Sequence, residues 1–127
     1  MKTYTDLKQS KKLAEILPIE SADMKWFTPA DDEGEFVEEA SLINNKSEYY
    51  LFEKVTDWND TPYIPCWSLA ALMEEMNRNG WKISLECCGA EFTAKFDDGE
   101  TFVMQYADNA IDAFYKMVVA LHEKKML

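Results

Sequence analysis

The chain has 127 residues, of which 47% are hydrophobic and 13% aromatic, so it is long and apolar enough to fold as one domain around a packed core. Its 24 acidic residues against 13 basic ones give a formal net charge of -11. That balance disfavours direct binding to nucleic acid or to an anionic membrane, because phosphate contacts need clustered Lys and Arg side chains.

The sequence predicts a cytoplasmic protein. Its longest apolar run, Met117 to Leu121, is far shorter than the roughly 20 residues that a membrane-spanning helix needs. The N-terminal residues lack the apolar core of a signal peptide. The three cysteines are odd in number and clustered, which fits a reducing compartment.

The acidic excess leaves two interpretations open. The charge keeps a soluble protein dispersed, or it forms an acidic surface that imitates DNA or binds a basic partner.

The first predicted element is a helix over residues 5–17. Thr5 is expected to cap it, because a side-chain oxygen at this position accepts from the free N–H groups of the first turn. Pro18 ends it, since the residue before a proline avoids the helical region.

The middle of the chain predicts short strands and irregular segments. Residues 24–27 predict one strand, and the apolar residues between 36 and 43 predict a second strand or an irregular segment. Alternation over 49–55 predicts a further strand. Residues 57–65, with two prolines, predict a loop.

A second helix is predicted from Leu69, with Ser68 as its cap. The apolar residues follow helical spacing on one side, and Asn79-Gly80 marks the end, because glycine accepts the left-handed conformation just beyond a helix.

Residues 81–106 predict a three-stranded antiparallel meander. If Gly89-Ala90 is a two-residue hairpin loop, Leu85 lies opposite Ala94 and Ile83 opposite Phe96, so that apolar residues meet on one face.

The second turn of the meander is predicted as a three-residue loop, Asp97-Asp98-Gly99. Phe96 then lies opposite Glu100, and Phe92 opposite Met104, which places Phe102 and Met104 on the buried face. The other face carries polar residues and is expected to be solvated or to form a site. Its members are Lys82, Ser84, Glu86, Glu91, Thr93, Lys95, Thr101, Val103 and Gln105.

The last helix is predicted over 109–125, with Asn109 as its cap. Its wide apolar stripe is expected to cover the sheet. The sequence therefore predicts an α+β fold in a single domain, 1–127: an antiparallel sheet of the meander plus one or two further strands, with helices on one face. Four phenylalanines are expected to dominate the core: Phe92, Phe96, Phe102 and Phe114.

The cysteines and the single histidine are weak candidates for chemistry. Cys87 and Cys88 are neighbours on a strand, so their side chains point to opposite faces and cannot readily hold one metal ion. Cys87 falls on the buried face, and Cys88 on the solvent face beside the turn. His122 is expected to stabilise the end of the last helix. No cofactor and no catalytic or metal-binding residue is predicted.

The remaining candidates are interaction residues. Glu86 and Glu91 lie on one face near the first hairpin turn, together with Cys88. Trp58 is expected to be an exposed aromatic anchor, and Tyr63 lies in the same loop. Trp26 and Trp67 are expected in the core.

Three segments resemble a family of small uncharacterised proteins from gut bacteria of the Bacteroides group, often encoded among phage or mobile-element genes. They are DLKQSKKLAEILPIESADM (6–24), PCWSLAALMEEM (65–76) and NAIDAFYKMVVALHEKKML (109–127). The resemblance implies a bacterial cytoplasmic setting and no particular activity.

The leading functional prediction is a non-catalytic, acidic protein of phage or mobile-element origin that binds another protein. Two alternatives stay open: a DNA mimic that inhibits a host DNA-binding protein, and a small ligand-binding domain or enzyme that uses the polar sheet face.

Overall fold

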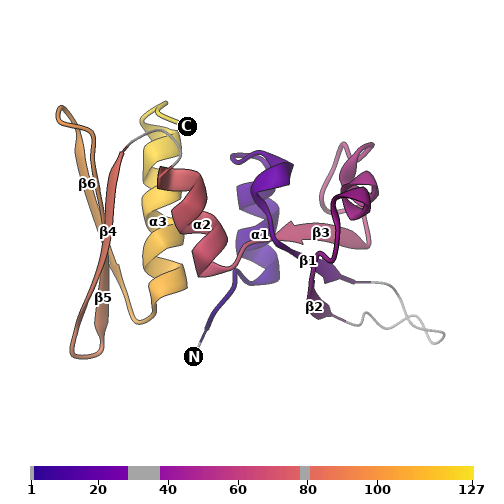
Figure 1. Cartoon of the computed structure of the whole chain (residues 1–127), viewed down its shortest axis with the longest axis horizontal. Helices are drawn as coiled ribbons and strands as arrows, with labels where there is room; N and C mark the ends of the chain where they lie inside the picture. Colours follow the sequence, from indigo (N-terminus) through magenta and orange to yellow (C-terminus); the bar gives the residue numbers. More distant parts are fainter. Residues whose placement is uncertain (1, 29–37, 78–80) are drawn as a thin grey trace.

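The computed structural model describes residues 2–28, 38–77 and 81–127. It contains two three-stranded antiparallel sheets, which lie at opposite ends of the molecule with α-helices between them (Figure 1). The predicted α+β class is confirmed. The strands of the first half do not extend the meander, however, but form a sheet of their own.

The first helix, α1 (Leu7–Ala14), is shorter than predicted and is capped by Asp6. The Asp6 carboxylate accepts from the Gln9 N–H at 2.8 Å, and the Gln9 side chain accepts from the Asp6 N–H at 3.1 Å. This reciprocal pair satisfies two N–H groups, so the predicted cap at Thr5 is wrong. Thr5 is instead fully buried, and its hydroxyl accepts from the Trp67 N–H at 3.2 Å.

The first sheet has the order β2-β1-β3. Its central strand β1 (Met24–Phe27) was predicted, and β2 (Glu39–Leu42) includes part of the second predicted segment. Phe36 and Val37, which begin that segment, lie outside the described residues, and Ile43 follows the end of β2. Strand β3 (Tyr63–Cys66) was predicted as a loop, because two prolines flank and enter it. It lies at the edge of the sheet, where a residue without an N–H is tolerated.

The strand predicted over 49–55 is wrong, because residues Lys46–Phe52 form a 3-10 helix, η2. Asn45 starts it by accepting from the Ser47 N–H at 3.0 Å. The turn places Phe52 in the interior and lets the Tyr49 hydroxyl donate to the Ala22 carbonyl at 2.7 Å. Another 3-10 turn, η1 (Ile19–Ser21), follows Pro18.

The second helix, α2 (Leu69–Asn77), begins as predicted. The Ser68 hydroxyl accepts from the Ala71 N–H at 3.2 Å and is itself hydrogen-bonded to the Asp23 carboxylate. The predicted end at Asn79-Gly80 lies outside the described residues.

The second sheet has the order β4-β5-β6, formed by β4 (Lys82–Cys88), β5 (Glu91–Asp97) and β6 (Phe102–Ala107). The predicted register of the first hairpin is confirmed, with Leu85 opposite Ala94. Gly89 has a φ of 62°, the left-handed conformation that the turn requires.

The predicted register of the second hairpin is wrong by three residues, because Phe96 lies opposite Val103. Residues 98–101 form the loop. The Asp98 carboxylate accepts from the N–H groups of Glu100 at 2.9 Å and Thr101 at 2.6 Å, which holds two more residues in the turn. An odd shift exchanges the two faces of β6. Val103 and Gln105 therefore face inward, and Phe102 and Met104 face outward.

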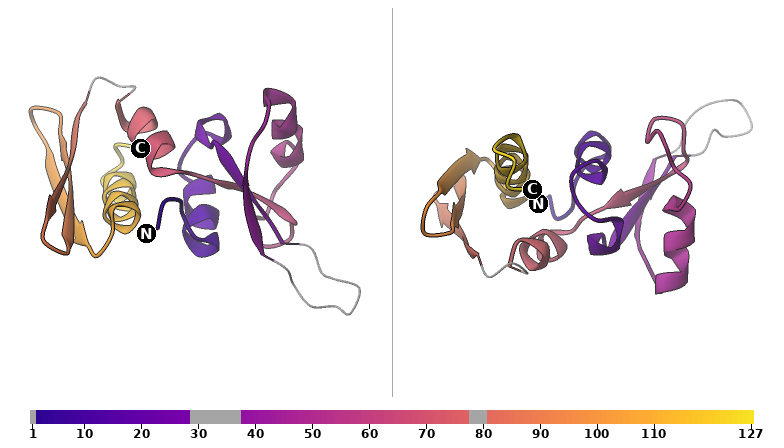
Figure 2. Two further views of the ribbon diagram at one scale, coloured as in Figure 1. Left: turned by 60° about the horizontal axis from the view of Figure 1, so that its bottom comes forward. Right: turned by 90° about the horizontal axis from the view of Figure 1, so that it is seen from above.

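The last helix, α3 (Ala110–Glu123), covers the inner face of this sheet (Figure 2). Asn109 caps it as predicted, accepting from the Asp112 N–H at 2.8 Å. Phe96 and Phe114 are fully buried, but Phe92 is only half-buried and Phe102 is 59% exposed. The predicted four-phenylalanine core is thus half correct, and Trp67 adds the largest buried side chain.

The N-terminal residues are joined to α3 by a polar cluster around Asp112. Its carboxylate accepts from Lys2 at 2.7 Å, from the Gln9 amide at 2.8 Å and from the Asn109 amide at 2.9 Å. Burial alone would raise the pKa of Asp112, but these hydrogen bonds together lower it below its ordinary value of 3.8. The charged carboxylate therefore stabilises the folded chain.

We expect this cluster to give stability that depends on pH. Because the pKa of Asp112 is lower in the folded chain, its contribution is present above about pH 4 and is lost as the pH falls through the folded-state pKa. Asp112→Asn should lower the free energy of unfolding by about 0.5–1.5 kcal/mol at pH 7. Urea unfolding should show this difference shrinking towards pH 3. Asp60→Asn, at an exposed carboxylate, is the control; equal pH dependence in both variants would contradict the account.

Candidate functional site

Two of the predicted interaction residues are half-buried against neighbouring aromatic rings and are not exposed anchors. Trp58 is half-buried, and its ring lies edge-on to Phe52 with 6.1 Å between ring centres. Tyr63 is half-buried in β3, with its ring centre 4.7 Å from that of Phe27. The prediction of Trp58 as an exposed anchor is therefore wrong: its polar neighbours in the sequence concealed a contact with η2.

The other candidates lie on the outer face of the second sheet, as predicted. Glu86 forms an ion pair with Lys95 at 2.9 Å, so its charge is already matched on the surface. Glu91 lies opposite Cys88 at the end of the hairpin, and both are exposed. This arrangement offers carboxylates at the rim of the face and no buried acid–base pair.

Cys87 is exposed, contrary to the prediction from its inward position. It lies in the next-to-last pair before the turn, and its thiol donates to the Gly89 carbonyl at 3.4 Å. Cys66 is the buried thiol, and burial raises its pKa, which makes it a poor nucleophile. His122 lies near the end of α3, where its ring contacts the Leu127 carbonyl at 3.1 Å.

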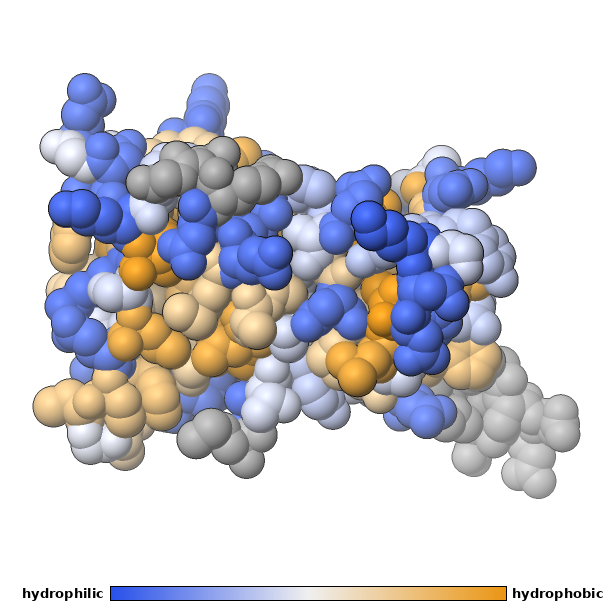
Figure 3. Space-filling view, in the orientation of Figure 1, coloured by the Kyte–Doolittle hydropathy of each residue, from blue (hydrophilic) through white to orange (hydrophobic). Residues whose placement is uncertain are grey.

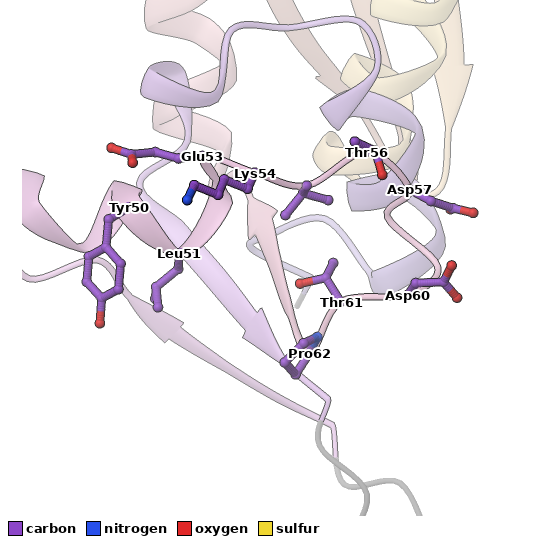
Figure 4. A pocket seen from close by; sticks show the side chains of 10 residues that line it. Tyr50, Leu51, Glu53, Lys54, Thr56, Asp57, Asp60, Thr61 and Pro62 are labelled. Carbon is purple, nitrogen blue, oxygen red and sulfur yellow. The ribbon is translucent and has the colours of Figure 1, made fainter.

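A groove of about 570 Å³ lies beside the segment that joins η2 to β3 (Figure 4). Glu53 and Lys54 point to one side of it, whereas Asp57 and Asp60 point to the other. A second depression of about 580 Å³ lies between η1 and α2. Neither is lined by Glu86, Thr93 or Gln105. In the parts of the chain that the structure describes, no three His, Cys, Asp or Glu residues are grouped to hold a metal ion.

A row of three exposed apolar side chains runs along β6. Phe102, Met104 and Tyr106 are 59%, 36% and 45% exposed, and they alternate along one strand on its outer face. The Tyr106 hydroxyl contacts the Met104 sulfur at 3.3 Å. We call these three residues the β6 strip. Large apolar side chains gathered on one surface are typical of interaction sites.

Strand β6 also lacks the charged residues and the proline that the other edge strands carry. Natural edge strands carry charges or proline, which oppose pairing with another chain. Strand β4 carries Lys82 and Glu86, β2 begins with Glu39, and β3 contains Pro65. The sequence of β6, FVMQYA, contains no charged residue and no proline. Among the edge strands that the structure describes, β6 is therefore open to contact with another molecule.

Acidic side chains stand at both ends of the β6 strip. Asp97, Asp98 and Glu100 surround the turn before Phe102. Glu91 and Asp108 lie at the other end, because Phe92 is opposite Ala107. The site is an apolar strip between two groups of carboxylates.

Figure 3 shows one side of the molecule, on which hydrophobic residues cover much of the half formed by the second sheet and its helices. Hydrophilic residues predominate along the upper rim and over the other half. Among the described residues, no helix has the length and apolar character needed to cross a membrane.

No protein-family model, no curated protein and no solved structure matches this chain. The resemblance of the three sequence segments to a Bacteroides-group family therefore stays a prediction.

Proposed function

We propose that this protein is a non-catalytic protein-binding domain, and that the β6 strip is the centre of its binding surface. The observation that carries the proposal is the exposure of Phe102, Met104 and Tyr106 side by side on a strand without charge. Aromatic residues and methionine are enriched in protein interfaces, and exposing them together in water is unfavourable. A partner that covers these side chains would remove their apolar surface from water, which favours binding.

The charges around the strip define the partner's chemistry. Carboxylates flank both ends, and the whole chain has a formal net charge of -11. A complementary surface presents apolar side chains in its centre and Lys or Arg at its margins. A second copy of the chain is a poor match, because antiparallel pairing of two β6 strands would place Glu100 of one copy near Asp108 of the other.

The polar groups on the outer face of the second sheet and those of the groove beside η2 favour binding over catalysis. Glu86 is paired with Lys95, and the charged side chains of the groove in Figure 4 point apart. Catalytic acids and bases need side chains that converge on one reacting atom. The resemblance to proteins of phage and mobile elements supports a search for the partner among bacterial proteins.

The double variant Phe102→Ser/Tyr106→Ser tests the proposal. Two aromatic anchors at about 1–2 kcal/mol each predict a loss of affinity of roughly 30-fold to 1000-fold for a partner retained from a bacterial extract. The measurement is quantitative affinity capture followed by titration with the purified partner.

The matched control is Leu42→Ser/Tyr50→Ser, which removes two side chains that are 63% and 64% exposed outside the second sheet. This control should bind as the unmodified chain does. Equal binding by both double variants, or loss only in the control, would exclude the β6 strip as the site.

A further inference from the structure

The backbone of β6 presents its free hydrogen-bonding groups at the same residues as the strip. The Asp98 N–H donates to the Thr101 carbonyl at 3.2 Å, so these two residues face each other across the hairpin. Hydrogen-bonded and non-bonded pairs alternate along an antiparallel ladder. The N–H and C=O groups of Phe102, Met104 and Tyr106 therefore point away from β5.

A second contact agrees with this alternation. The Lys116 ammonium, which comes from α3, donates to the Tyr106 carbonyl at 3.1 Å. That carbonyl must therefore be accessible from outside the ladder. Lys116 closes one end of the edge, and the backbone groups of Phe102 and Met104 remain towards the turn.

We propose that the partner binds as an extended segment that adds a fourth strand to the sheet along β6; this inference rests on the proposed function. Backbone groups of Phe102 and Met104 hydrogen-bond the added strand. Every second side chain of that strand lies on the outer face beside the β6 strip. One extended segment then forms hydrogen bonds with the backbone groups at the edge and also covers the exposed apolar side chains.

The dimensions and charges of the site specify the segment. The strip from Phe102 to Tyr106 spans roughly 13 Å, the length of about five extended residues. The segment is expected to carry two or three alternating apolar residues, preferably β-branched or aromatic. Lys or Arg on both sides of them would meet Asp98 and Glu100 at one end and Glu91 and Asp108 at the other.

Selection of random peptides of about twelve residues on the immobilised full chain tests this specification, since that length holds one strand and its flanks. We expect enriched peptides to alternate apolar and polar residues between basic flanks, and to be lost on Phe102→Ser/Tyr106→Ser. Peptides without alternation, acidic peptides or no enrichment would overturn the inference. A concentration-dependent dimer of the chain that buries the β6 strip would also overturn the inference.

The variants Met104→Pro and Met104→Val separate strand addition from docking on the face. The Met104 N–H points away from β5, so proline at this position removes no bond of the native ladder. Both variants remove the Met104 side chain from the strip, and only proline also removes the N–H, so we expect Met104→Pro to weaken binding of the enriched peptide at least about tenfold more than Met104→Val does. Equal binding by the two variants would overturn strand addition.

Amide hydrogen exchange on the unmodified chain covers the case in which Met104→Pro fails to fold. The enriched peptide should slow exchange at Phe102 and Met104 and leave β4 unchanged; no slowing at these two amides would overturn strand addition. Binding that survives Met104→Pro and is lost in Phe102→Ser/Tyr106→Ser rejects strand addition alone. Binding that survives both rejects the proposed function as well.

Discussion

Replacing Phe96 by alanine is expected to lower the free energy of unfolding by about 3–5 kcal/mol. The side chain is fully buried under α3, and its ring lies edge-on to Trp81 with 4.8 Å between ring centres. Removing it takes away apolar burial and leaves a cavity among rigid neighbours. Denaturant unfolding followed by circular dichroism measures the loss.

Phe102→Ala is the matched control, because it removes the same atoms six residues later, from a side chain that is 59% exposed. We expect it to change the free energy of unfolding by less than about 0.5 kcal/mol. Comparable losses at the two positions would show that Phe102 is buried, as the register derived from the sequence requires, and would contradict the structure.

The three cysteines are expected to react with an aromatic disulfide reagent in two separate phases. Cys87 and Cys88 are exposed at the end of a hairpin and should react at once. Cys66 is fully buried, and burial raises its pKa, although hydrogen bonds with the Thr5 and Ser10 side chains oppose the shift. Since the thiolate is the reactive form and needs an opening of the fold, Cys66 should react at least about a thousandfold more slowly.

Spectrophotometric titration of released thiolate measures both phases. In the double variant Cys87→Ser/Cys88→Ser the fast phase should vanish, and unfolding in denaturant should release the remaining thiol. A fast phase that includes all cysteines would show that the contact between β3 and the N-terminal segment opens readily.

The first hairpin of the second sheet could be predicted from the sequence because two constraints agreed. Gly89 fixes the turn, and pairing Leu85 with Ala94 keeps the apolar residues on one face. In the second hairpin, Gly99 also has a positive φ of 93°, so the turn was correctly located. Its length was not, because the Asp98 carboxylate bonds two further N–H groups, and no pattern of hydrophobic residues records such bonds.

The first half of the chain was harder to predict because short segments contain little periodic information. Residues 49–55 alternate as well as many strands do, yet Asn45 initiates a 3-10 helix that buries Phe52. Strand β3 pairs with β1 in spite of Pro65, since it lies at the edge of the sheet. Both outcomes depend on tertiary contacts that the local sequence does not determine.

The candidate site was missed as a consequence of the shifted register. The register predicted from the sequence places Phe102 and Met104 in the core, and it leaves Trp58, which packs on Phe52, as the aromatic residue expected to be exposed. One feature of the sequence could have found the site. The segment 102–107 is the only strand of the meander without a charged residue, although it lies at an edge, and edges of soluble proteins usually carry one.

The most direct test of the binding surface is photo-cross-linking from position 102. A photoreactive phenylalanine analogue replaces Phe102 in the full chain, and the same analogue at Tyr50, another exposed aromatic residue, serves as the control. In a bacterial extract, position 102 should yield a discrete adduct, and the cross-linked peptide should hold apolar residues between Lys or Arg. An adduct pattern identical to that from position 50, or a cross-linked segment with acidic flanks, would contradict a basic-flanked partner at the β6 strip.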